Sequence, residues 1–134
     1  RIARLVKSLF EVRGQRGHAF AADLVRGRSV EGVTSTDGFP LDDPADVAFL
    51  MKLLPTLERQ SKGAAQRLLE AVPARHLVVT FPARSLGGRG KGMRASYARD
   101  LHRLAAQAEG GPFELTELPG LDEPTWLLHR RGLP

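Results

Sequence analysis

The sequence predicts an α/β fold with an open, mainly parallel sheet that ends in an antiparallel hairpin. Three features of the 134 residues indicate this class: short apolar segments alternate with amphipathic helical segments, two alternating segments close the chain, and no internal repeat is present. A chain of this length can bury a core of its own, so one domain is expected.

Apolar residues at helical spacing predict three helices: residues 1–12, residues 56–72, and the segment from Tyr97 to Ala108. In the second of these, Thr56 is expected to be the N-cap residue, and Pro73 follows the expected end. The third should stop at the sequence Gly-Gly-Pro over residues 110–112.

Strands are expected over residues 18–25, 45–52, 76–82, 113–118 and 125–131. The second of them is almost continuously apolar, which is typical of a central strand that is covered on both faces. The last two alternate in polarity around Pro119-Gly120, which indicates an antiparallel pair. Residues 26–44 are rich in Gly, Ser, Thr, Asp and Pro, and they are expected to form a long surface loop.

Composition limits the function classes. The chain has 20 Lys and Arg against 15 Asp and Glu, a formal net charge of +5, which favours a polyanionic partner such as RNA. It has no cysteine, which excludes a disulfide framework, a thiolate zinc site and a cysteine nucleophile. No apolar run reaches the roughly 20 residues that span a bilayer, so we expect a cytoplasmic protein without a membrane partner.

A glycine-rich basic segment follows the strand expected over residues 76–82. Between Arg84 and Arg94 it carries Arg84, Arg89, Lys91 and Arg94 with no acidic residue. Glycines let the backbone approach a phosphate and the cations neutralise it, so an RNA-binding loop is one interpretation and a solvated basic turn is the other. The nucleoside-triphosphate loop is excluded, because Lys91 is followed by Gly92 rather than by Ser or Thr.

Two long motifs resemble the aminoglycoside-resistance 16S rRNA methyltransferases. The first is D-V-A-F-L-M-K-L-L-P-T-L-E-R-Q over residues 46–60, and the second is F-P-A-R-S-L-G-G-R-G-K-G-M over residues 81–93. The resemblance extends from about Asp23 to Arg131. It implies a Rossmann-like class I methyltransferase fold, N7 methylation of guanine 1405 in 16S rRNA of the 30S subunit, and S-adenosyl-L-methionine as the cofactor.

The resemblance also implies roles for individual residues. Asp23 and Leu24 match the family's adenine-binding pair, although a turn-forming Asp23 is the structural alternative. Met51 would pack on the adenine, and Lys52 would face the methyl-transfer site or an RNA phosphate. The family's cofactor-contacting Gln aligns with Ser61, one residue after Gln60, so both are candidates.

Residues of the basic segment are the candidates for contact with rRNA: Arg84, Ser85, Arg89, Lys91 and Arg94. No metal is expected, and the four His residues are expected to be structural. The family's glycine-rich cofactor loop has no counterpart in this sequence, so the chain is expected to be a partial domain whose N-terminal portion is missing. The alternative function is a non-catalytic RNA-binding remnant of such an enzyme.

Overall fold

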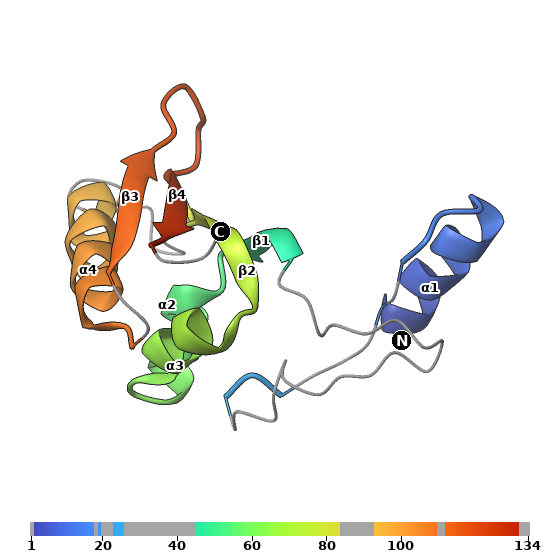
Figure 1. Ribbon diagram of the computed structural model, residues 1–134, viewed down its shortest axis with the longest axis horizontal. Helices are drawn as coiled ribbons and strands as arrows, with labels where there is room; N and C mark the ends of the chain where they lie inside the picture. Colours follow the sequence, from blue (N-terminus) through green and yellow to red (C-terminus); the bar gives the residue numbers. More distant parts are fainter. Residues whose placement is uncertain are drawn as a thin grey trace.

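The computed structural model describes residues 2–17, 19, 23–25, 45–83, 93–109 and 112–131. Its centre is a four-stranded sheet in the order β1-β2-β4-β3 (Figure 1). The strands are β1 (Ala45–Met51), β2 (Ala74–Thr80), β3 (Phe113–Glu117) and β4 (Thr125–Arg130). β1 and β2 are parallel, whereas β4 runs antiparallel to both β2 and β3. The structure thus confirms the α/β fold and the closing antiparallel hairpin, whereas the sheet that was predicted to be mainly parallel is mixed among the described strands, with β1 and β2 as its parallel pair.

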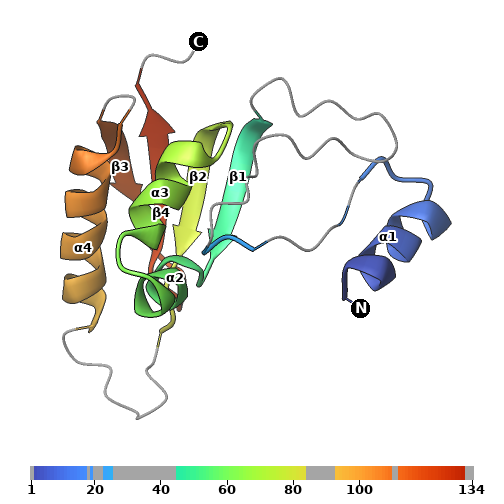
Figure 2. The same ribbon diagram turned by 90° about the horizontal axis from the view of Figure 1, so that it is seen from below.

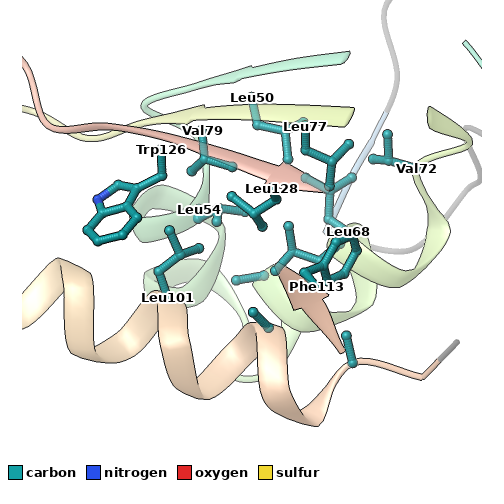
Figure 3. Close-up of a cluster of buried hydrophobic side chains, with 14 of the residues drawn as sticks. Leu50, Leu54, Leu68, Val72, Leu77, Val79, Leu101, Phe113, Trp126 and Leu128 are labelled. Atoms are coloured by element: carbon teal, nitrogen blue, oxygen red, sulfur yellow. The ribbon is translucent and has the colours of Figure 1, made fainter. Parts of the chain in front are cut away.

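Three helices pack on one face of this sheet: α2 (Leu54–Gln60), α3 (Ala64–Ala71) and α4 (Met93–Gln107). Figure 3 shows the apolar side chains between the strands and these helices. Leu69, Leu77, Leu101, Leu128 and Val79 are fully enclosed in this layer. The alternation along the strands explains the arrangement, because every second side chain points to the same face of a sheet.

The helix expected over residues 56–72 is interrupted, so this prediction was wrong in its continuity. Gly63 has φ 85°, a left-handed conformation that favours glycine, and it separates α2 from α3. The carboxylate of Glu58 stabilises the break by accepting hydrogen bonds from the backbone N–H of Gly63 at 2.9 Å and of Ala65 at 3.3 Å. Thr56 is not an N-cap, because α2 already begins at Leu54.

The expectation that residues 45–52 form a strand covered on both faces was also wrong. β1 is an outer strand of the described sheet. Leu50 faces the helices and is buried, but Val47, Phe49 and Met51 lie on the other face and are 44%, 66% and 65% exposed. The reason is that α2, α3 and α4 all cover the same face, so an apolar side chain on the opposite face of β1 has no cover among the described residues.

The N-terminal helix α1 (Ile2–Val12) confirms the first predicted helix, with none of its residues buried. Its apolar side chains Ile2, Leu5, Leu9 and Val12 are exposed, and Figure 2 shows α1 apart from the sheet. Within the described part of the chain, no helix is long and apolar enough to cross a membrane.

Two predicted segments are only partly described. In the strand expected over residues 18–25, Leu24 and Val25 form a turn, and Ala19 and Asp23 belong to no strand. His18 and residues 20–22 lie outside the described residues, as does most of the predicted loop over residues 26–44. The side chains of Leu24 and Val25 pack against the core, which fixes this turn on the folded part of the chain.

Candidate cofactor and RNA site

Two of the predicted site residues, Met51 and Lys52, lie at the edge of the sheet where β1 and β2 end. The two strands are parallel, with Met51 opposite Thr80, so their carboxyl ends meet at one edge. Here this edge is called the carboxyl edge, and it comprises Met51, Lys52, Thr80 and Phe81. In open α/β sheets, ligands bind at the carboxyl ends of the strands.

Lys52 occupies an unusual backbone conformation at this edge. It is the one non-glycine residue with positive φ in the described part of the chain, with φ 54°. Such a conformation persists only where neighbouring contacts hold it. Here the N–H of Lys52 donates to the carbonyl oxygen of Thr80 at 3.0 Å and to its Oγ1 at 3.1 Å. The backbone of Lys52 is therefore held by the last residue of β2.

The turn between β3 and β4 reaches the same edge. Glu123 lies in this turn, and its carboxylate pairs with the ammonium of Lys52 at 2.5 Å. The turn is itself attached to the end of β2, because the N–H of Phe81 donates to the carbonyl oxygen of Pro124 at 2.9 Å. Sequence reasoning missed Glu123 and Thr80. The signal for Thr80 was its position at a strand end, whereas nothing in the sequence distinguishes Glu123 from other turn acids.

The candidate adenine-binding residues lie on two segments. Met51 ends β1 and exposes 65% of its surface beside Lys52. Asp23 is exposed, and its Oδ1 accepts a hydrogen bond from the N–H of Val25 at 3.1 Å, which closes a tight turn. Leu24 lies between Asp23 and Val25 in the sequence, and its partly buried side chain packs against the core. The turn-forming role of Asp23 is thus real, and its role toward adenine stays a prediction.

Gln60 and Ser61 lie at the far end of α2 from Lys52. Gln60 is the exposed last residue of this helix, and Ser61 is its C-cap. The six steps from Leu54 to Gln60 advance by about 9 Å along a helix axis, which carries both side chains away from the carboxyl edge. The Oγ of Ser61 already accepts a hydrogen bond from Arg67 at 3.2 Å. The structure therefore brings Met51 and Lys52 together but does not bring Gln60 or Ser61 beside them.

Of the five residues predicted to contact RNA, Arg94 lies among the described residues. It lies in the first turn of α4, with a side chain that is 58% exposed and a loose contact of 3.8 Å with Glu117. An exposed pair at this distance leaves the cation accessible to a phosphate. Arg84, Ser85, Arg89 and Lys91 lie outside the described residues.

The described histidines take part in packing. His76 and His129 face each other on neighbouring strands, and their rings stack with centroids 4.7 Å apart. His102 meets Trp126 edge to face at 5.4 Å. These contacts agree with the structural role that was predicted, and His18 lies outside the described residues.

A small cavity lies between α2 and α4, beside the carboxyl edge. Phe81 and Tyr97, whose rings stack at 4.6 Å, contribute to its lining, together with Leu54 and Pro55. Its volume is about 80 Å³. Ligand pockets usually hold roughly 300 Å³ or more, so this cavity is too small for a nucleoside.

Comparison with known proteins decides the family. The family model described as "Ribosomal RNA methyltransferase (FmrO)" matches residues 18–119, which is more than half of the chain. The chain belongs to the FmrO family of ribosomal RNA methyltransferases. Both motifs quoted above lie within the matched residues, and so do β1, β2 and α4.

Curated relatives of the family share the name 16S rRNA (guanine(1405)-N(7))-methyltransferase. The relative from Serratia marcescens is 51% identical over 59 residues, which are 44% of this chain and 24% of the relative. The relative from Frankia casuarinae is 40% identical over 89 residues, which are 66% of this chain and 31% of the relative. These matches thus span a quarter to a third of the length of the relatives.

Solved structures show the same fold. The 16S rRNA methyltransferase RmtF, crystallised with S-adenosyl-L-homocysteine, is 38% identical, with a TM-score of 0.66 over 96% of this chain and 44% of that chain. An rRNA methylase from Escherichia coli is 22% identical with a TM-score of 0.67, a likeness that concerns the fold. The chain therefore has a Rossmann-like class I methyltransferase fold, with the antiparallel hairpin that was predicted.

Proposed function

We propose that this chain is the C-terminal portion of a methyltransferase domain that methylates N7 of guanine 1405 in 16S rRNA. The match of the FmrO family over residues 18–119 carries the proposal. The exposed apolar face of β1 supports a partial domain, since Val47 and Phe49 would be covered by the part of the fold that the longer relatives possess. Aminoglycoside resistance would follow from the modified ribosome.

The residues at the carboxyl edge fit S-adenosyl-L-methionine as cofactor. Met51 offers an exposed apolar side chain on which a purine ring can stack, and the turn at Asp23 presents a carboxylate and backbone groups that match the donors and acceptors of adenine. When bound, the cofactor supplies an electrophilic methyl group to the lone pair of guanine N7, while the carbon–sulfur bond pair stays with the sulfur.

Guanine N7 carries no proton, so the chain has no proton to remove during the transfer. Positioning and exclusion of water are then the tasks of the protein. Lys52, which Thr80 and Glu123 hold at the carboxyl edge, is the residue we propose beside the acceptor base or its phosphate. The base would leave its stack to reach this edge.

The proposed RNA partner is the assembled 30S subunit. Arg94 lies in the first turn of α4, and Arg84, Arg89 and Lys91 precede it in the sequence, which gives this segment several cations suited to recognition of phosphates and RNA shape. Base identity would be read at the carboxyl edge instead.

Methyl transfer to purified 30S subunits tests the proposal. The full-length enzyme that contains this chain is incubated with radiolabelled S-adenosyl-L-methionine, and nuclease digestion with mass spectrometry locates the methyl group. We expect 7-methylguanosine at position 1405. Binding to 30S subunits without methyl transfer would instead identify a non-catalytic RNA-binding remnant.

Asp23→Ala in the full-length enzyme is expected to weaken cofactor binding about tenfold to a hundredfold. The change removes a charge-assisted hydrogen bond to the adenine amine, worth roughly 1.5 to 3 kcal/mol. Calorimetric titration with S-adenosyl-L-methionine measures the effect. The melting temperature without cofactor should change little, because Asp23 is exposed and its hydrogen bond from the N–H of Val25 is a local contact at the surface.

Asp23→Asn is the matched variant, since an amide oxygen can still accept from Val25 while the charge is lost. If Asp23 served only the turn, Asn would preserve both stability and cofactor affinity, and Ala would lower the melting temperature alone. An unaltered dissociation constant in both variants would remove Asp23 from the cofactor site.

A further inference from the structure

The ion pair between Lys52 and Glu123 joins two segments that are distant in sequence. Lys52 follows β1, whereas Glu123 belongs to the turn between β3 and β4. Their charged atoms are 2.5 Å apart, and the side chains keep 51% and 35% of their surface exposed. Such a pair adds little to stability, because solvent screens it. Its position at the carboxyl edge therefore calls for an explanation other than stability.

Both partners are held by backbone contacts that do not depend on the ion pair. Lys52 is fixed by its two hydrogen bonds to Thr80. The backbone of Glu123 is fixed by Thr125, whose Oγ1 donates to the Glu123 carbonyl oxygen at 3.0 Å. Thr80 and Thr125 are themselves partners in the β2–β4 ladder, and both are buried. The two side chains thus meet because the sheet brings their backbones together.

The proposed reaction places cations at this edge. The cofactor carries a positive sulfonium, and the positive charge passes to the guanine ring when N7 gains the methyl group. An unpaired ammonium near either cation would raise its free energy, since like charges repel over several ångströms in a partly desolvated site. Lys52 can remain beside the reacting groups only if an anion compensates its charge.

We propose that Glu123 is a positioning residue that holds the ammonium of Lys52 and neutralises it, so that a cationic cofactor is tolerated at the carboxyl edge. The inference rests on the proposed methyltransferase function. It predicts that loss of the Glu123 charge lowers the affinity for a ligand with a sulfonium, and lowers the affinity much less for the corresponding ligand with a neutral thioether. S-adenosyl-L-methionine and S-adenosyl-L-homocysteine are such a pair.

The test compares the two ligands by calorimetry in the full-length enzyme. Glu123→Gln keeps the shape of the side chain and removes its charge. We expect the affinity for S-adenosyl-L-methionine to fall roughly three- to tenfold, as partly screened charges at this range imply, with the affinity for S-adenosyl-L-homocysteine nearly unchanged. The ratio of the two affinities is the readout, because a general loosening of the site would weaken both ligands alike.

Two further variants make the outcome decisive. Glu114→Gln removes the same charge from the same hairpin, where Glu114 pairs with Arg131 at 2.7 Å, and it should leave the ratio unchanged. Adding Lys52→Met to Glu123→Gln removes the uncompensated cation and should restore the ratio. Equal weakening of both ligands by Glu123→Gln, or no change in either, would overturn the inference. If the unaltered enzyme bound neither ligand, the proposed function itself would fail, and the inference with it.

Discussion

Arg130→Ala is expected to lower the free energy of unfolding by about 2 to 4 kcal/mol, as the loss of several charge-assisted hydrogen bonds implies. Arg130 lies in β4, and its guanidinium donates to the carbonyl oxygens of Leu69 at 2.9 Å and Val72 at 3.1 Å. These carbonyls belong to the C-terminal end of α3, where the last turn of a helix leaves acceptors without partners. The arginine therefore attaches α3 to the sheet.

The guanidinium of Arg130 is partly buried between α3 and β3. Desolvation lowers the pKa of Arg130 below its ordinary value, and the carbonyl oxygens and the ring of Phe113, 5.0 Å away, face the cation. Truncation to Ala would leave those oxygens partly buried without their donor. Chemical denaturation monitored by circular dichroism measures the change in unfolding free energy.

Arg131→Ala is the control for Arg130→Ala. Arg131 follows directly in sequence, but its side chain is 61% exposed and pairs with Glu114 at the surface. Exposed pairs contribute roughly 0 to 1 kcal/mol, so this variant should unfold close to the unaltered protein. Equal destabilisation by the two substitutions would mean that the contact of Arg130 with α3 adds nothing to stability.

The sheet was largely predictable from the sequence because its signals are local. β3 and β4 alternate in polarity around a Pro-Gly turn, and β2 is a short apolar run. The break between α2 and α3 was not predictable in this way. The apolar spacing continues on both sides of Lys62 and Gly63 as if one helix were present. The carboxylate of Glu58 stabilises the break by accepting hydrogen bonds from Gly63 and Ala65, a contact that the apolar pattern does not indicate.

β1 illustrates a different limit. An apolar run predicts that a strand will be covered, but it does not say by which residues. In the described structure the helices cover the face that carries Leu50, and the face that carries Phe49 remains open. The placement of Lys52 at the end of this strand was nevertheless correct, since strand ends follow from the run of apolar residues alone.

The role of Glu123 could not be predicted from the sequence. Its pairing with Lys52 depends on the order β1-β2-β4-β3, which brings the β3–β4 turn to the carboxyl ends of β1 and β2. An acid in a turn carries no local signal of that neighbour. Candidate residues from strand ends could therefore be named from the sequence, whereas the residue that orients one of them required the topology.

Replacement of Arg84, Arg89 and Lys91 together by Ala is expected to weaken binding of the full-length enzyme to 30S subunits roughly tenfold to a hundredfold. Each cation that contacts a phosphate releases about one counterion, so the slope of log affinity against log salt should flatten by about 2 to 3. Filter binding over a range of salt concentrations measures both quantities.

The control replaces Arg59, Lys62 and Arg103 by Ala. These residues are exposed and lie in and beside α2 and in α4, and their replacement changes the net charge by the same amount. A loop that contacts phosphates gives a larger loss and a flatter slope than this control. Equal behaviour of the two triple variants would show that residues 84–91 form a solvated turn, and that the basic character of the chain acts only through its total charge.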